Sequence, residues 1–371
     1  MNKKVIVAGH ICLDVTPVFA DNGVPFSELL LPGKMPHVGA ADIHTGGCVA
    51  NTGLAMKKLG VDVSLMGKVG DDHFGSIVKE ILEEHEVSEG LVVDRKSTTS
   101  YSVVLAPPGV DRIFLHNPGA NDTFVSSDVA EEALKEASLL HFGYPPLMQK
   151  MFEDGGCELE SIMKRAKANG VATSLDMAAV DPASEAGRAD WIAILSKVLP
   201  FVDFFVPSVE ELAYMLDREL YEEWQWRANG GDTTDVVDID TEVPRLAQKT
   251  LNLGAKVVLV KCGAKGMYWQ TADTEALMQV GKKVELDVAD WANRSGFERS
   301  FVPRRVLSGT GAGDTSIAAF LTTMLEGCSP EECLQLAAAT GACCVENYDA
   351  LTGLASLDEL RKRISDGWSK S

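Results

Sequence analysis

The sequence lacks the features that mark membrane and nucleic-acid-binding proteins. No apolar run approaches the length of a bilayer span, and the amino-terminal run is soon interrupted by His10 and Asp14. Basic residues are few, with 34 Lys and Arg against 54 Asp and Glu and a formal net charge of −20. Binding to a nucleic-acid backbone needs a basic face. We therefore expect a cytoplasmic protein with no membrane and no nucleic-acid partner, although a small anionic ligand needs only a local positive potential.

The cysteines also lack any metal-binding spacing. The eight cysteines include no C-x-x-C pair; Cys343 and Cys344 are adjacent, and Cys328 and Cys333 are five positions apart. A chain of this length builds its core without disulfide staples. Reduced and mostly buried thiols are expected.

What the sequence does contain is a regular alternation of strands and helices. Hydrophobic residues make up 46% and charged residues 24%, as in ordinary globular proteins. Such alternation predicts a mainly parallel sheet covered by helices on both faces, with ligands at the carboxyl ends of the strands. The predicted strands cover residues 4–9, 62–70, 139–144, 171–177, 203–208, 256–263 and 304–307, and the predicted helices cover 46–60, 72–85, 157–169, 187–199, 209–216 and 314–327.

Four regions depart from this alternation. Residues 14–45 are expected to form short strands and turns outside the core, and residues 100–119 to form two strands joined by a Pro-Gly turn. Residues 217–240 and 284–300 are expected to be irregular loops, either surface excursions or parts of a pocket rim.

A glycine-rich loop precedes the predicted helix at residues 314–327. The stretch reads VLSGTGAGDTSIAAF, with three glycines between Gly309 and Gly313. Glycines let the backbone approach a ligand, and the first amides of a helix are unpaired donors at the positive end of its dipole. This predicts an anion hole suited to a phosphate. The loop is not a Walker A motif, because no Gly-Lys-Ser/Thr follows.

Asp314 follows this loop directly. A carboxylate next to a stored anion is unfavourable, but it has a purpose if the anion is attacked. It then takes the proton of an incoming hydroxyl while the amides hold the charge of the phosphoryl group. A glycine-rich helix start without chemistry is the alternative.

Several sequence blocks in the same order resemble the ribokinase-like (PfkB-type) carbohydrate kinase family over nearly the whole chain. The blocks are GHICLD, TGGCVANTGLAMKKLG, GKVGDDHFG, PGAND, VKCGAKG and GTGAGDTSIAAF. The resemblance implies one ribokinase-like domain over residues 1–371, a three-layer α/β/α sandwich. It also implies a small β lid formed by about residues 12–45 and 98–120, through which two copies would form a homodimer.

The resemblance also implies roles for particular residues. Asp314 would be the catalytic base, and ATP with Mg²⁺ would phosphorylate a hydroxyl, a primary alcohol, of a sugar or a sugar-like small molecule. The anion hole would be formed by Gly311, Ala312 and Gly313, the acceptor would be held by Asp14, Gly46, Gly47 and Asn51, and the nucleotide by Gly263 and Gly266.

The chemistry of these residue types agrees with the implied roles, although each residue also has an alternative structural role. The carboxylate of Asp14 can accept two sugar hydroxyls, or it can form an Asx turn. The amide of Asn51 suits a polyol, or it is a buried group satisfied by backbone. Lys261 ends a strand, where it can meet a phosphate or serve structure alone.

Two positions depart from the family pattern. The family usually has Pro-Asn-x-x-Glu after a central strand, linked to magnesium and phosphate placement. Here Ser208 replaces the asparagine, so that contact is weakened, while Glu211 keeps the acid and would order the water shell of magnesium. The glycine-rich signature begins with Ser308 and Gly309 rather than Asp-Thr, which argues against activation by a monovalent cation.

Three other functions compete with a sugar kinase. A nucleoside kinase of the same family needs room for a base, and the segment 14–45 offers only Phe19 and Phe26 to stack one. A catalytically silent sugar-binding regulator would not need Asp314. A nicotinamide-dependent oxidoreductase is disfavoured, because the opening VAGHICLD lacks the glycine fingerprint of a dinucleotide site.

Overall fold

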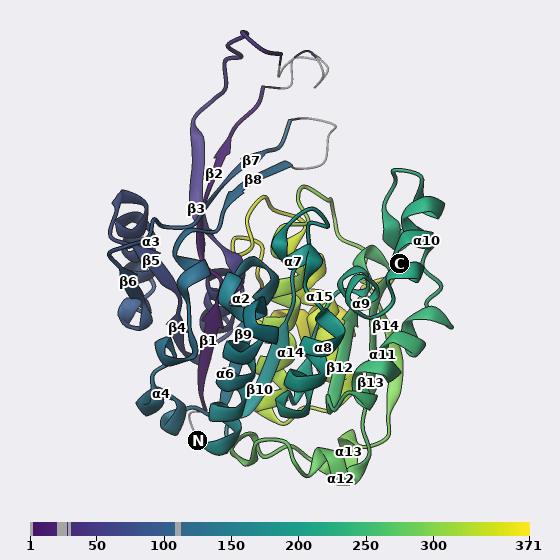
Figure 1. Ribbon diagram of the computed structural model, residues 1–371. Coiled ribbons are helices and arrows are strands. Elements are labelled where there is room, and N and C mark those ends of the chain that lie inside the picture. Colours follow the sequence, from purple (N-terminus) through teal and green to yellow (C-terminus); the bar gives the residue numbers. More distant parts are fainter. Residues whose placement is uncertain (1–2, 21–27, 29–30, 108–112) are drawn as a thin grey trace.

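The computed structural model describes residues 3–20, 28, 31–107 and 113–371. An eight-stranded sheet forms its centre (Figure 1). In spatial order the strands are β14 (Ser295–Arg299), β13 (Gly266–Thr271), β12 (Val257–Lys261), β11 (Phe204–Phe205), β10 (Ala172–Asp176), β9 (Leu139–Gly143), β1 (Lys4–Gly9) and β4 (Asp62–Met66). The strands from β4 to β12 pair in parallel, and β13 and β14 add antiparallel pairs at one edge. The mainly parallel sheet is confirmed.

Helices occupy most of the chain between the strands. The described helices are α2 (Gly47–Lys58), α3 (His73–Glu84), α4 (Glu131–Glu136), α5 (Gln149–Phe152), α6 (Cys157–Ala168), α7 (Glu185–Arg188), α8 (Trp191–Val198), α9 (Val209–Leu216), α10 (Arg218–Ala228), α11 (Glu242–Asn252), α12 (Thr274–Leu277), α13 (Val288–Trp291), α14 (Ala312–Glu326), α15 (Pro330–Cys344) and α16 (Leu357–Ser365). None of these helices is long and apolar enough to span a bilayer.

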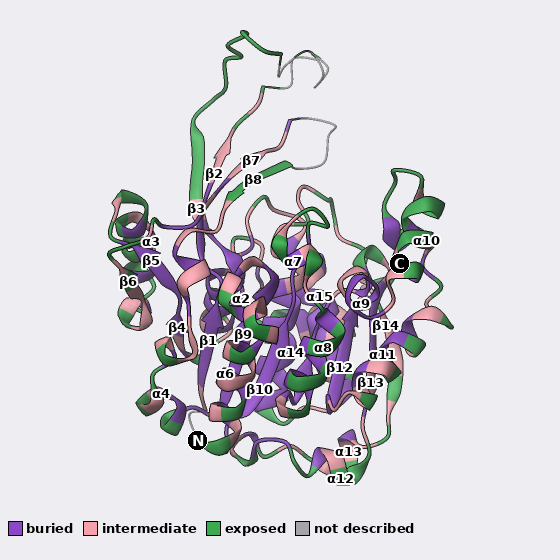
Figure 2. Cartoon of the chain, in the orientation of Figure 1, coloured by how far each residue is buried: buried purple, intermediate pink, exposed green. Residues whose placement is uncertain are grey.

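Two hydrophobic cores lie on opposite faces of this sheet. Successive strand residues alternate between them, since side chains of a strand point to opposite faces. In β1, Ile6 and Ala8 join the core formed with α6, α8, α9 and α11. Val5 and Val7 join the core formed with α2, α14 and α15. Figure 2 shows the strands buried between these helix layers, so the three-layer α/β/α architecture is confirmed.

A small four-stranded sheet stands out from the body at the carboxyl ends of the parallel strands (Figure 1). We call it the small sheet; its strands, in order, are β3 (Ala41–Gly46), β2 (Cys12–Pro17), β7 (Tyr101–Leu105) and β8 (Ile113–Asn117). The segment predicted to lie outside the core, residues 14–45, and the strand pair predicted at residues 100–119 both contribute to it. The Pro-Gly turn at Pro108 and Gly109, and Phe26, lie outside the described residues.

The strand expected at residues 304–307 does not form. This segment instead contacts the end of α15: the Arg304 amide donates to Glu346 Oε1 at 2.8 Å and the Leu307 amide to the Val345 carbonyl at 2.8 Å. The strand expected at 62–70 is divided between β4 and β5 (Lys68–Gly70), and β5 pairs with β6 (Val92–Asp94) in a separate sheet. The division falls at Gly67, where a Cβ atom would lie 2.6 Å from Cγ2 of Ile11.

The two stretches expected to be irregular contain regular structure. Residues 217–240 include α10, which begins at the N-cap Asp217, and the 3₁₀ turn η7 (Thr233–Val236). Trp224 of α10 is fully buried and donates to Glu242 Oε2 at 2.9 Å, so an amphipathic helix was missed. Residues 284–300 include β14, which the pairing with β13 stabilises although its own residues have little strand preference.

The helix expected at residues 187–199 is interrupted. The helix α7 ends at Arg188 and α8 begins at Trp191, with extended backbone at Ala189. Asp190 accepts from the Ala193 amide at 3.0 Å, which makes it the N-cap of a new helix.

Candidate active site

The glycine loop has the geometry of an anion site at the start of α14. Gly311 is the N-cap with φ of +72°, and a Cβ atom there would lie 2.3 Å from Cβ of Ala350. Within the described part of the chain, the amides of Gly311, Gly313 and Asp314 have no hydrogen-bond acceptor. The Ala312 amide differs, because it donates to the Gly309 carbonyl at 3.3 Å. The loop therefore presents unpaired donors at the positive end of a fifteen-residue helix.

Asp314 lies in the first turn of that helix and is 3% exposed. Three side chains donate to its carboxylate. Asn51 Nδ2 lies 3.0 Å from Oδ2, Thr52 Oγ1 lies 3.3 Å from Oδ1, and the Tyr144 hydroxyl lies 2.8 Å from both oxygens. Burial raises the pKa of Asp314 above its usual value, and the donors, with the Lys261 ammonium, partly oppose that rise. A carboxyl group with a raised pKa is suited to take a proton near neutral pH.

The predicted acceptor residues meet at the amino terminus of α2. Asp14 lies inside β2 of the small sheet, and a Cβ atom at Gly46 would be 2.2 Å from Asp14 Oδ2. Gly47 has φ of +84° and packs against His10, whose carbonyl accepts from the Val49 amide at 3.1 Å. Asn51 is one turn further along α2 and contacts Asp314. The structure thus connects the predicted base with the predicted acceptor residues through one helix.

Two histidines at this place were missed by the sequence analysis. His10 follows β1 and His116 lies on β8, with their Nε2 atoms 3.3 Å apart. The Nδ1 atom of His116 is 3.0 Å from Ser102 Oγ. Burial, and then the nearby His116, lowers the pKa of His10 well below its usual value, so His10 is neutral. His10 stands inside the GHICLD block at a strand end, a position that could have marked it as a site residue.

Lys261 is the cation next to the anion site. A Cβ atom at Gly313 would lie 3.4 Å from Cδ of Lys261 and 3.7 Å from its Nζ. Its ammonium is 2.7 Å from Oδ1 of Asp176, a residue at the end of β10 that the sequence analysis did not select. Burial alone would lower the pKa of Lys261, but Asp176 and Glu211 outweigh it and leave the pKa raised. Lys261 is therefore a permanent positive charge beside Gly313.

Ser208 and Glu211 form a capping box at the start of α9. The Ser208 amide donates to Glu211 Oε2 at 2.7 Å, and the Glu211 amide donates to Ser208 Oγ at 3.2 Å. Ser208 also forms a β-bridge with Lys261, which places the box beside the cation. No group of three or more His, Cys, Asp or Glu side chains in the described residues is arranged to hold a metal ion.

The two predicted glycines of the turn after β12 are explained by packing. Gly266 has φ of +131°, and a Cβ atom there would lie 2.1 Å from the Glu298 carbonyl oxygen of β14. Gly263 begins the 3₁₀ turn η8 (Gly263–Lys265), where a Cβ atom would lie 2.9 Å from Thr234 Oγ1. The turn is thus tightly packed between β14 and η7.

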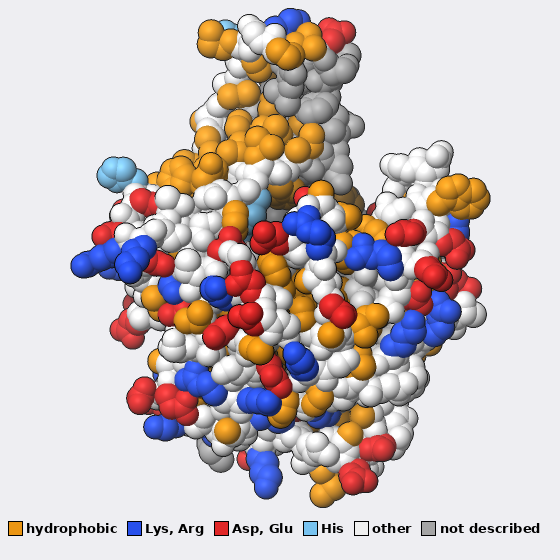
Figure 3. Space-filling view, viewed as in Figure 1, with side chains coloured by type: hydrophobic (Ala, Val, Ile, Leu, Met, Phe, Trp, Pro, Cys, Tyr) orange, Lys and Arg blue, Asp and Glu red, His pale blue; other side chains and the backbone are white. Residues whose placement is uncertain are grey.

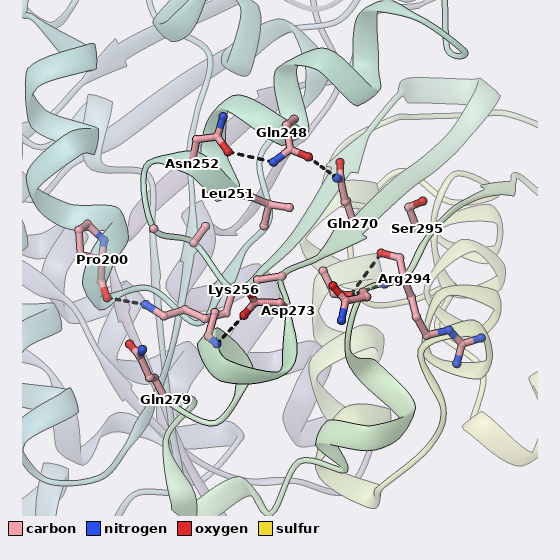
Figure 4. A pocket seen from close by; sticks show the side chains of 16 residues that line it. Pro200, Gln248, Leu251, Asn252, Lys256, Gln270, Asp273, Gln279, Arg294 and Ser295 are labelled. Atoms are coloured by element: carbon pink, nitrogen blue, oxygen red, sulfur yellow. Dashed lines mark hydrogen bonds between the residues drawn. The ribbon is translucent and has the colours of Figure 1, made fainter.

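A cavity of about 630 Å³ lies elsewhere, at the amino-terminal end of β12 (Figure 4). It is lined by Gln248 and Asn252 of α11, Gln270 of β13 and Arg294, and by Lys256, which donates to the Pro200 carbonyl. Ligands of parallel sheets bind at the opposite, carboxyl edge. The candidate site is therefore defined by Asp314, its hydrogen-bond donors and the unpaired amides that lie together, and not by the volume of a cavity.

A family model and several known proteins match this chain. The family model for pfkB family carbohydrate kinases matches residues 2–356. The chain belongs to this family of carbohydrate kinases. It is 26% identical to the ribokinase of Arabidopsis thaliana (98% of this chain, 84% of that protein) and 24% identical to an uncharacterized sugar kinase of Archaeoglobus fulgidus (81% and 98%).

Solved structures of other proteins have the same fold as this pfkB-family kinase. The Arabidopsis thaliana ribokinase complexed with ribose and ATP superimposes with a TM-score of 0.71 at 21% identity, covering 98% of each chain. A putative ribokinase II of E. coli in complex with ATP and Mg²⁺ gives a TM-score of 0.70 at 22% identity, covering 98% of this chain and 99% of that one. The ribokinase-like fold expected from the sequence blocks is confirmed.

Proposed function

We propose that this kinase transfers the terminal phosphoryl group of ATP to a hydroxyl, a primary alcohol, of a sugar or sugar-like molecule. Asp314 takes the hydroxyl proton, the hydroxyl oxygen bonds to the γ-phosphorus, and the bond from that phosphorus to the bridging oxygen of ADP breaks. The amides of Gly311 and Gly313 hold the charge of the transferring group. Ala312 joins them only when its bond to the Gly309 carbonyl opens. The single observation that carries the proposal is the buried Asp314 carboxylate beside unpaired amides and the Lys261 ammonium.

The acceptor in this proposal is an uncharged polyol. Asp14, Gly46, Gly47 and Asn51 hold its hydroxyls, since carboxylates accept two and an amide both donates and accepts. Two carboxylates, Asp14 and Asp314, would repel an acidic sugar. The neighbouring His10 and His116 have lowered pKa values owing first to burial, so they supply no cation at neutral pH. Ribokinases and fructokinases among the relatives support this choice.

ATP in this proposal lies along the strand ends, with Mg²⁺ on its phosphates. Lys261 and the turn at Gly263 and Gly266 contact the phosphates, and Ser208 lies beside them. Mg²⁺ keeps several waters and uses few protein ligands. Glu211 fits such a water-mediated contact, since only Oε2 is used by the capping box. The structural neighbours solved with ATP, and with ATP and Mg²⁺, support both ligands.

The small sheet is proposed to be a lid over the acceptor in a single-domain protein of residues 1–371. Closing it would exclude water and limit hydrolysis of ATP. The small sheet and the segment between β2 and β3 carry exposed apolar side chains (Figure 3): Ile43, Ile113 and Leu115 in the strands, and Val18, Leu31, Met35 and Val38 between β2 and β3. A second copy pairing through the lid would cover them. Sedimentation should then give a dimer that Ile43→Ser with Leu115→Ser converts to a monomer, and a monomeric wild type would contradict this.

A cytoplasmic location is part of the same proposal. Six of the eight cysteines are buried, namely Cys12, Cys48, Cys262, Cys333, Cys343 and Cys344. The expectation that most of the thiols are buried is therefore confirmed. ATP is a substrate of the cell interior in this proposal, and fractionation of cells expressing the chain would test it.

The test is Asp314→Asn, assayed by release of ADP over sugars, polyols, sugar acids and nucleosides. Losing a positioned base costs about 10²–10⁴-fold in turnover, while calorimetry should still detect ATP binding. Wild-type turnover in the variant would refute the assigned base. A nucleoside as best acceptor would identify the rival nucleoside kinase, and silence of the wild-type protein over the whole panel would favour the regulator.

A further inference from the structure

Tyr144 makes an unusual contact with the proposed base. It follows β9 directly, and its hydroxyl lies 2.8 Å from Oδ1 and 2.8 Å from Oδ2 of Asp314. A phenol donates one proton, so this proton is shared between both carboxylate oxygens. Tyr144 is half-buried as a residue, but burial, and then the nearby Asp314 carboxylate, raise the pKa of its hydroxyl well above the usual value, so the phenol keeps its proton and donates it.

The backbone of Tyr144 is held in a conformation that bulky residues rarely adopt. Its φ of +68° and ψ of 42° lie in the left-handed region, and Pro145 follows, which normally favours extended backbone before it. Hydrogen bonds on both sides hold it: its amide donates to the Asp176 carbonyl at 3.3 Å, and its carbonyl accepts from the Leu147 amide at 3.0 Å. Such outliers persist where the surroundings over-determine them, and they cluster at active sites.

The phenol contacts both of the oxygens to which an acceptor hydroxyl could give its proton. A hydroxyl that gives its proton to Asp314 must reach one of the two oxygens that Tyr144 now contacts. Asn51 and Thr52 already take one position on each oxygen. The Tyr144 hydroxyl can keep donating its proton to one oxygen and release the other. The Asn51 amide and the Thr52 hydroxyl each contact only one oxygen and have no second oxygen to release.

We propose that Tyr144 is a positioning residue, which orients the carboxylate of Asp314 before the acceptor binds and yields one of its oxygens to the acceptor hydroxyl. The inference rests on the proposed role of Asp314 as the base. Tyr144 acts through Asp314 and needs no contact with the transferred phosphoryl group.

Other groups around Asp314 also set its charge, so the test must isolate the phenol. Both Tyr144 and Asn51 stabilise the ionised carboxylate by donating to it. The remaining titratable or polar groups that face Asp314 are Cys48 and Thr52 of α2, Asp176 of β10, Lys261 of β12 and Cys344 of α15.

The first experiment compares the pH dependence of kcat/KM in wild type and Tyr144→Phe. Loss of a donor to the carboxylate should raise the pKa of Asp314 and move the acid limb of the profile upward by about one pH unit. Tyr214→Phe is the matched control. It also removes a tyrosine hydroxyl that makes a hydrogen bond within the protein, because the Tyr214 hydroxyl donates to the Gly187 carbonyl at 3.2 Å. Its profile should coincide with that of wild type.

A second substitution changes the donor strength while keeping the ring. Placing 3-fluorotyrosine at position 144 makes the phenol more acidic and the hydrogen bond to the carboxylate stronger. The acid limb should then move to lower pH, opposite to Tyr144→Phe. This result stays informative if the phenylalanine variant folds poorly, which thermal melting would show.

The outcomes separate this inference from the function on which it rests. Profiles that do not move with either change at position 144, while Asp314→Asn is inactive, would overturn the role of Tyr144 alone. Full turnover in Asp314→Asn would refute the base and the inference with it. A shift in the same direction for both changes would also overturn the role of Tyr144.

Discussion

Lys261 and Asp176 form an ion pair that links two neighbouring parts of the site, with Nζ 2.7 Å from Oδ1. Asp176 ends β10 and is 1% exposed, while Lys261 ends β12 and reaches toward Gly313. Burial raises the pKa of Asp176, and the Lys261 ammonium opposes that rise. The pair therefore holds a cation at the anion site without leaving it as an isolated buried charge.

Lys261→Met should destabilise the fold and slow turnover. Removing one partner of a buried ion pair leaves the other charge uncompensated, which costs about 3–5 kcal/mol in the free energy of unfolding. Denaturant titration measures this loss. The double variant Asp176→Asn with Lys261→Met should lose less than the sum of the two single variants, and strict additivity would contradict the coupling.

Gly311→Ala should lower the stability of the fold, whereas Gly313→Ala should mainly lower turnover. Gly311 has positive φ and no room beside Ala350, so Gly311→Ala should lower the free energy of unfolding by about 2–4 kcal/mol. At Gly313 the added atom would meet Lys261 at ordinary contact distance, so stability should change by less than about 1 kcal/mol. Turnover of Gly313→Ala should nevertheless fall by about 10- to 100-fold, because the methyl group displaces the phosphoryl group. Normal kinetics would show that Gly313 does not face that group.

Asp14→Asn should weaken binding of the acceptor and leave the binding of ATP unchanged. A hydrogen bond to a charged group contributes about 1.5–3 kcal/mol, so kcat/KM for the sugar should fall by about 10- to 100-fold. Asp42→Asn is the control, since Asp42 is an exposed carboxylate on β3 of the same sheet. Equal losses in both variants would indicate a general electrostatic effect rather than contact with the acceptor.

Lys256→Met should change how stability depends on pH. Burial lowers the pKa of Lys256 from 10.5 to about 8, although Asp203 opposes it. Between these values the unfolded chain binds a proton that the folded chain does not, so wild-type stability rises with pH there. The free energy of unfolding of Lys256→Met, relative to wild type, should fall by on the order of 1–3 kcal/mol from pH 7 to 10. Lys79→Met, at an exposed position on α3, should show no such trend.

Many of the regular elements were predicted where local pattern and burial agreed, although α15 and α16 were not. The strands β1, β9, β10 and β12 are buried almost throughout, and α14 follows a glycine loop and is closed by Gly327. The expectation at 304–307 was wrong and β14 was missed for the same reason. In both places pairing with distant backbone, rather than local preference, decided the conformation.

The sequence by itself determined the family, the alternation of strands and helices through the parallel part of the sheet, and the residue types at the glycine-rich start of α14. Glycines and an aspartate at a helix start are local features, and their chemistry can be recognised in a single block. Only the tertiary structure brought Tyr144, Asn51 and Thr52 onto Asp314, paired Lys261 with Asp176, and set His10 against His116. These contacts join segments far apart in the chain, and hydrogen bonds and desolvation act over a few ångströms of space, which spacing in the sequence does not report.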